Sequence, residues 1–268
     1  MYSNCGDQSG IHRDMQELKV IMTKDSAIDF VKALKRPFSD SRKFLTGAVL
    51  GIIPIVNLTV VGYTLKGTGL TEEEVEEGGL PEWRDYGDLF KKGLMAAVIG
   101  FLLFLPALLV FFGTMGGVVF SPTMSVIFGG IPMETWDKLA AGQITDMQIE
   151  NWFARNWTQF IPLFTGAVPF LLLGGLLAVV AFYVMPAAIL GWLKEGRIGA
   201  AFSWDNLRTT VTLDYLVNWL IVGFLTGVMS TVVGWVPILG VGIKTYVNGV
   251  FSYTVYAAVF QKLMTRTQ

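Results

Sequence analysis

The sequence predicts an all-α integral membrane protein, and two observations carry that prediction. First, 53% of the 268 residues are hydrophobic and only 15% are charged, with a mean hydropathy of +0.54. A soluble domain carries about 25% charged residues, so this composition argues against a water-soluble globule. Second, long stretches contain no charged residue, and about 20 apolar residues in a helix can cross a bilayer core of roughly 30 Å.

The uncharged stretches place four transmembrane helices. Charged residues are missing between Lys92 and Glu134, between Arg155 and Lys194, and on both sides of Lys244 from Asp214 to Lys262. We expect transmembrane helices over residues 93–113, 163–185, 214–235 and 238–260.

A further apolar stretch, residues 44–65, has the length of a fifth span, but Pro54 lies at its centre. Each half is about ten residues, or ~16 Å of helix, which is half of the bilayer core. The phrase around it recurs later in the chain: Gly51-x-x-Pro54-Ile55 with Tyr63 corresponds to Gly234-x-x-Pro237-Ile238 with Tyr246. Because Pro and Gly are where a membrane helix turns most easily, we expect a re-entrant hairpin in the first copy and a full helical hairpin in the second.

The distribution of Lys and Arg chooses between the two threadings. If residues 44–65 cross the membrane, eleven of the 20 basic residues lie on one side and nine on the other. If the segment is re-entrant, seventeen lie on the side of the termini and three on the opposite side. We therefore predict a multi-pass protein of the cytoplasmic membrane with both termini in the cytoplasm. Residues 113–133 are uncharged but rich in Gly, and we interpret them as a short apolar excursion at the outer face, with a re-entrant segment as the alternative.

The rest of the chain completes one membrane domain over residues 25–262. Residues 1–24 lack a secretory signal and are expected to be a disordered extension, with Met15 and Met22 as alternative starts. Apolar and basic residues at helical spacing predict interfacial amphipathic helices on the cytoplasmic side. These helices span residues 25–37, 80–92 and 198–210, while residues 114–162 form the outer loop and residues 263–268 the tail.

Polar side chains repeat at four-residue spacing in the last two spans, so each set shares a helix face. The candidates are Lys244, Asn248, Ser252 and Tyr256 in the last span, Asn218, Thr226 and Ser230 in the preceding one, and Asn57 in the hairpin. They could line a hydrated path. The interpretation that we favour is interhelical hydrogen bonding, worth ~0.6 kcal/mol for each bond. The pairs Gly47/Gly51, Gly113/Gly117 and Gly223/Gly227 fit close helix approach within or between subunits.

The residues that most enzymes need are missing from the sequence. The chain has one Cys and one His, Cys5 and His12, and none of the sequence patterns of zinc proteases, serine hydrolases or nucleotide-binding loops. No carboxylate pair lies in a predicted span, and the net charge of −1 argues against nucleic-acid binding. We expect no catalytic residue, no metal and no cofactor.

Two segments resemble a known family. They are LPEWRDYGDLFKKGL at residues 80–94 and MPAAILGWLKEGRIGAAF at residues 185–202. Together with Gly62-Tyr63, the Leu-Pro-x-Trp and Gly-x-Ala-Phe motifs are similar to those of uncharacterised polytopic membrane proteins of archaea and some bacteria, known only as a domain of unknown function. The resemblance covers residues 25–262. It implies an archaeal or bacterial cytoplasmic membrane and no activity.

Three functional hypotheses remain open. The leading one is an integral membrane component without enzymatic activity that assembles as a homo-oligomer or with a membrane partner protein in the lipid bilayer. The alternative is a channel or transporter for small solutes or ions that uses the hairpin and the polar faces. The second alternative is a lipid-handling membrane protein.

Overall fold

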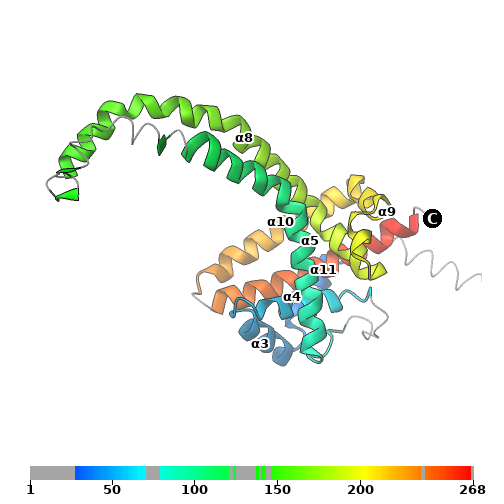
Figure 1. The fold of residues 1–268 in the computed structure, drawn as a ribbon. Coiled ribbons are helices and arrows are strands. Elements are labelled where there is room, and N and C mark those ends of the chain that lie inside the picture. Colours follow the sequence, from blue (N-terminus) through cyan, green and yellow to red (C-terminus); the bar gives the residue numbers. More distant parts are fainter. Residues whose placement is uncertain are drawn as a thin grey trace, which may run out of the picture. The chain divides into compact units, whose positions relative to one another are not determined.

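The computed structural model describes residues 28–70, 79–120, 123–124, 137–138, 140–142, 146–236 and 239–266. All regular secondary structure in these ranges is helical, which confirms the all-α part of the prediction (Figure 1). The chain divides into two compact units, one containing residues 1–99 and 184–268 and the other residues 100–183. Residues 1–24, for which disorder was expected, and Pro237 lie outside the described residues.

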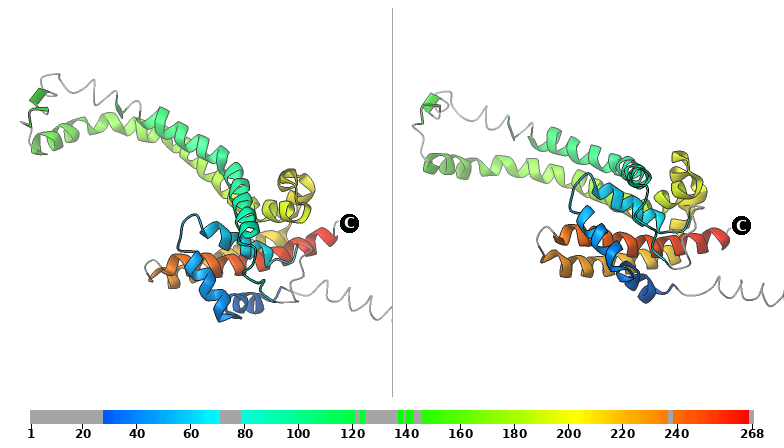
Figure 2. Two further views of the ribbon diagram at one scale, coloured as in Figure 1. Left: turned by 60° about the horizontal axis from the view of Figure 1, so that its bottom comes forward. Right: turned by 90° about the horizontal axis from the view of Figure 1, so that it is seen from below.

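Helix α11 (Leu239–Arg266) is the central element of the first unit. It runs antiparallel to α10 (Leu213–Gly234), and α3 (Ser41–Leu50) and α4 (Asn57–Lys66) also pack against it (Figure 2). Its buried side chains form the largest part of the core and include Tyr246, Val250, Phe251, Val255 and Phe260. The apolar residues of this helix are therefore covered mainly by protein.

The apolar stretch at residues 44–65 is not one continuous helix. Helix α3 ends at Leu50, α4 begins at Asn57, and the turn between them contains Pro54. Asp40 begins α3 by accepting hydrogen bonds from the backbone N–H groups of Arg42 and Lys43. We call α3, the turn and α4 the hairpin.

Glycines allow the hairpin to touch its neighbours at backbone distance. A Cβ atom on Gly51 would lie 2.8 Å from the Cα of Gly242, and one on Gly242 would overlap the carbonyl oxygen of Ala48. Gly47 lies in the same way against the ring of Tyr246. The predicted pair Gly47/Gly51 therefore does bring two helices together. A Cβ atom on either glycine of the other two pairs, Gly113/Gly117 and Gly223/Gly227, would meet no atom of the described residues within 4 Å.

Two of the expected interfacial helices take a different form in the structure. Residues 79–85 are not helical: Pro81 disfavours helical backbone at Leu80, and Asp85 has a positive φ of 53°, so α5 (Tyr86–Gly113) begins only at Tyr86. Residues 198–210 form three short helices in place of one, because the hydroxyl of Ser203 caps a new helix at Trp204. These are η3 (Ile198–Phe202), α9 (Trp204–Leu207) and η4 (Arg208–Val211).

The amino-terminal basic segment is also short. It consists of α2 (Phe30–Lys35) followed directly by η1 (Arg36–Phe38), where Pro37 begins a tighter turn.

The second unit contains the distal part of α5, the helical turns η2 (Thr114–Phe120) and the first part of α8 (Asp146–Glu195). Within this unit Gly174 lies against Ala107 and Val110, so the two long helices are in contact there. Helix α8 begins at Asp146, inside the expected outer loop at residues 114–162. Residues 146–160 contain neither Gly nor Pro, so nothing in the sequence ends the helix before the span begins.

Three helices are long and apolar enough to cross a membrane. They cover Tyr86–Gly117, Phe160–Glu195 and Leu213–Gly234, with mean hydropathies of 2.7, 2.4 and 1.9 in their most apolar windows. At most 22% of each window is buried inside the protein, so most of these apolar side chains need lipid around them. The protein is therefore membrane-embedded. The fourth expected span corresponds to α11, which is not in this set because polar residues such as Lys244 and Asn248 lower its hydropathy.

We predict that Gly242→Ala destabilises the first unit by about 1–3 kcal/mol, because the added methyl group has to push α3 away from α11. Thermal unfolding of the purified protein in detergent measures the effect. Gly234→Ala is the matched control, since a Cβ atom there meets nothing within 4 Å. Equal unfolding temperatures for Gly242→Ala and wild type would contradict the close contact.

Candidate functional site

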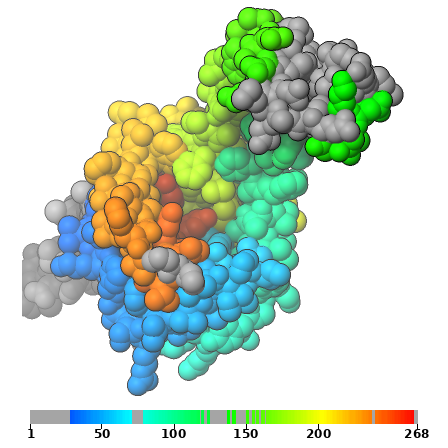
Figure 3. Space-filling view, turned by 90° about the vertical axis from the view of Figure 1, so that its left-hand side faces the viewer, coloured from blue at the N-terminus to red at the C-terminus, as the bar shows by residue number. Residues whose placement is uncertain are grey.

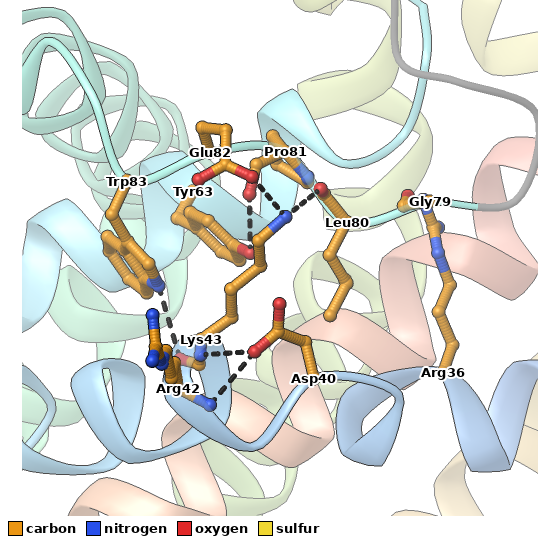
Figure 4. Close-up of polar contacts among 10 residues, drawn as sticks. All are labelled: Arg36, Asp40, Arg42, Lys43, Tyr63, Gly79, Leu80, Pro81, Glu82 and Trp83. Atoms are coloured by element: carbon orange, nitrogen blue, oxygen red, sulfur yellow. Dashed lines mark hydrogen bonds and ion pairs between the residues drawn. The ribbon is translucent and has the colours of Figure 1, made fainter.

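Residues 79–85, which we call the strap, are bound to both helices of the hairpin (Figure 4). The hydroxyl of Tyr63 on α4 donates to the carbonyl oxygen of Pro81 at 2.9 Å, and Nε1 of Trp83 donates to the carbonyl oxygen of Lys43 on α3 at 3.1 Å. Nζ of Lys43 in turn donates to the carbonyl oxygen of Leu80 at 2.8 Å and pairs with the carboxylate of Glu82 at 2.7 Å. The strap therefore closes the hairpin on the side away from its turn.

An aromatic cluster lies beneath the strap. The rings of Tyr63 and Trp83 stack with centroids 3.8 Å apart and planes 10° from parallel. Tyr246 of α11 lies 5.9 Å from Tyr63 and packs edge-on against Phe44 of α3, also at 5.9 Å. Such pairs contribute about 0.5–1.5 kcal/mol each beyond the apolar area that they bury. This cluster gives a structural reason for both Gly62-Tyr63 and the Leu-Pro-x-Trp motif.

The side chain of Arg36 joins three segments that are distant in sequence. Its terminal nitrogens donate to the hydroxyl of Thr254 on α11 at 2.8 Å and to the carbonyl oxygens of Gly67 and Gly79 at 2.7 Å each. Gly67 ends α4, where helix carbonyls carry a partial negative charge. Burial lowers the pKa of the Arg36 guanidinium from its usual value, but an Arg side chain remains charged in proteins. Arg36 therefore joins the end of α4 and the beginning of the strap to α11.

Asp40 provides the opposite charge at the start of α3. Hydrogen bonds from the backbone N–H groups of Lys43 and Arg42 hold the pKa of the Asp40 carboxyl below its usual range. The base of the hairpin is thus polar and hydrogen-bonded, whereas its turn is apolar.

The structure brings together only part of the predicted polar path. Nδ2 of Asn248 on α11 donates to the hydroxyl of Ser230 on α10 at 2.8 Å, which is an interhelical hydrogen bond. Asn218 and Thr226 instead donate to carbonyl oxygens of their own helix, at Asp214 and Val222.

The remaining candidates lie apart from that bond. Lys244 is exposed, whereas Ser252 and Asn57 are half-buried. A continuous hydrated path stays a prediction. Among these residues, the hydrogen bond between Asn248 and Ser230 is of the interhelical kind that we favoured.

Two polar residues whose side chains join distant segments, Arg36 and Asn206, could not be identified from the sequence. Arg36 appears there only as one of several basic residues before Pro37. Asn206 is completely buried, and its Nδ2 donates to the carboxylate of Glu195 and to the carbonyl oxygen of Ala200, both at 2.9 Å. Gly191 leaves room for it, because a Cβ atom there would lie 2.8 Å from Nδ2 of Asn206. This arrangement packs the Gly-x-Ala-Phe segment against the end of α8.

The residues that the structure describes contain no group of three His, Cys, Asp or Glu side chains able to hold a metal ion. The described polar groups at the strap instead bind one another and the backbone. The arrangement is a structural lock between the hairpin, the strap and α11.

We predict that Arg36→Met destabilises the first unit by about 3 kcal/mol, because it removes charge-assisted hydrogen bonds to Thr254, Gly67 and Gly79 and leaves buried carbonyl oxygens unpaired. Lys35→Met is the matched control, since the neighbouring Lys35 is exposed. Both are measured by thermal unfolding in detergent. A loss of stability that is the same in the two variants would contradict the role of Arg36.

We compared the chain with known proteins. No curated protein and no solved structure was found to match the chain. Residues 46–238 match the model of a family described as "Protein of unknown function (DUF4013)". The match is shorter than the range 25–262 expected from the resemblance, and it contains the strap and the hairpin turn but not α11. Because it covers more than half of the chain, the protein belongs to the DUF4013 family of proteins of unknown function.

Proposed function

We propose that the protein is a multi-pass component of the cytoplasmic membrane that has no enzymatic activity and acts by assembling with itself or with a partner membrane protein. The observation that carries the proposal is the outward face of α10. Gly223 and Gly227 lie one turn apart on this face and meet no atom within 4 Å, beside exposed Phe224 and Val228.

Glycines at the same spacing already make a helix contact elsewhere in this protein. Gly47 and Gly51 of α3 let that helix approach α11 at backbone distance. In lipid, where burial of apolar area gives no driving force, small residues favour association because they allow close van der Waals packing. The face of α10 therefore has the features of a helix–helix contact that is completed by another chain.

The hairpin supports a re-entrant topology within this assembly. Its turn exposes apolar side chains, with Ile53 48% and Ile55 71% exposed, and Leu45 and Val49 continue this surface along α3. A turn in water would be polar. Each helix has ten residues, or ~15 Å, which reaches about halfway into the bilayer core.

We therefore propose that the hairpin enters the bilayer from the cytoplasmic side with its turn first, beside the first turns of α11, and that its polar base faces the cytoplasm. The spans are then α5, α8, α10 and α11, with both termini in the cytoplasm. Figure 3 shows the hairpin, in blue and cyan, beside the adjoining ends of α10 and α11, in orange, on one face of the molecule.

Assembly is tested by the double substitution Gly223→Leu and Gly227→Leu. The two added side chains prevent close helix approach on this face, so the variant should form a smaller complex than the wild type in mild detergent and in nanodiscs. Native mass spectrometry measures the mass of the complex and identifies any co-purifying chain. The control, Val232→Leu, adds bulk to an exposed position of the same helix away from the two glycines. A wild-type protein that is monomeric without partners in nanodiscs would refute the proposal.

The topology is tested by replacing Cys5 and introducing one Cys at a time by Ile55→Cys, Thr68→Cys or Ala140→Cys. A membrane-impermeant maleimide added outside intact cells should label position 140 only. Position 55 should react from neither side until detergent is added, because the turn lies in lipid. Labelling of position 55 from outside the cell would show that the segment crosses the membrane.

A further inference from the structure

A cavity of about 240 Å³ lies between the first turns of α10 and the last turns of α11. It is large enough for several waters or for a small part of a larger molecule. Ile28, which precedes α2, and Phe30, its first residue, form one side of it. No role in the lock or in the assembly face uses this cavity.

The polar and apolar residues of the cavity are separated along the helices. Asp214 on α10 and Lys262 on α11 lie opposite each other with carboxylate and ammonium 3.8 Å apart, and Asn218 follows one turn further along α10. Beyond them the wall is apolar, with Val217 and Ile221 of α10 and Val259 of α11. From Asp214 to Ile221 the distance along the helix is ~10 Å.

The change from polar to apolar residues along the cavity runs in the same direction as the change from headgroups to acyl chains in a bilayer leaflet. Asp214 lies in the first turn of a helix that is apolar enough to span the membrane, so the charged end of the cavity is near the membrane surface and the apolar end points toward the hydrocarbon. A molecule that fills it must have a charged end and an apolar chain.

The charges of the cavity identify the kind of headgroup. One carboxylate and one ammonium lie side by side, and both remain accessible, with the side chain of Asp214 48% and that of Lys262 24% exposed. A ligand carrying both a phosphate and a primary ammonium matches both side chains, whereas a purely anionic headgroup matches only Lys262.

We propose that this cavity binds a zwitterionic phospholipid of the phosphatidylethanolamine type. Its phosphate contacts Lys262, its primary ammonium donates to Asp214, and the start of one acyl chain lies against Val217, Ile221 and Val259. This site goes beyond the proposed function, because assembly through the outward face of α10 requires no bound lipid.

The experiment uses the full-length protein, stripped of lipid in detergent and titrated with defined lipids under native mass spectrometry. Wild type should retain phosphatidylethanolamine at least tenfold better than phosphatidylglycerol, which lacks the ammonium, and better than phosphatidylcholine, whose methylated ammonium has no N–H to donate to Asp214. Soluble glycerophosphoethanolamine should not bind, because it has no chain for the apolar wall. Equal retention of the three lipids, or binding of the soluble headgroup alone, would overturn the proposal without any variant.

Variants then locate the site. Lys262→Met and Ile221→Trp should each reduce retention of phosphatidylethanolamine at least fivefold, the first by removing the phosphate contact and the second by filling the cavity. Lys244→Met and Val232→Trp are the matched controls, because both residues are exposed and lie outside the cavity. Lipid retention that falls equally in the variants and in their controls, or in neither, would show that the lipid binds elsewhere.

Discussion

The first unit depends on the contact between α3 and α11 at Gly51 and Gly242. Two helices with side chains at the crossing lie 8–10 Å apart. Here glycine faces glycine, and the carbonyl oxygen of Ala48 lies where a Cβ atom of Gly242 would be. At this separation Tyr246 of α11 contacts Phe44 and Tyr63 of the hairpin, and Arg36 binds Thr254. The close backbone approach therefore lies beside the aromatic cluster and the Arg36 hydrogen bonds in one continuous core.

The recurring phrase in the sequence has a counterpart in space. Tyr63 and Tyr246 occupy equivalent places after the two Gly-x-x-Pro-Ile turns, and their rings lie 5.9 Å apart in the core. Thr64 lies against Gly249, and Gly67 is joined through Arg36 to Thr254, so α4 and α11 run in the same direction side by side. The two hairpins thus meet through the helices that follow their turns.

The first unit has one polar region, whose groups are hydrogen-bonded within the protein, and two exposed apolar regions. The polar base of the hairpin is occupied by internal hydrogen bonds around Lys43 and Arg36. The apolar turn at Ile53 and Ile55 is exposed, as is the glycine face of α10. A protein whose polar groups bind one another and whose apolar groups lie outside is organised for contact with lipid and with other membrane helices. This division is the physical basis of the proposed function.

Much of the local structure could be predicted from the sequence, because it depends on short-range rules. The helical class and three of the spans follow from long uncharged stretches, and the interruption at Pro54 follows from the missing N–H and fixed φ of proline. The pair Gly47/Gly51 was also found by its spacing. The failures were local as well: Pro81 and Asp85 delay the start of α5, and Ser203 divides the segment that was expected to be one helix.

What the sequence by itself determined is therefore which segments are helical, where they break and which of them need lipid, since periodicity, proline and hydropathy act within a few turns. Only the tertiary structure decided which basic residue is a structural bond and which glycine is a contact. Arg36 and Lys35 are alike in sequence, but only Arg36 reaches carbonyl oxygens that the fold brings from distant segments. Gly51 and Gly223 likewise have the same spacing to a second glycine, but only Gly51 faces another helix of the same chain.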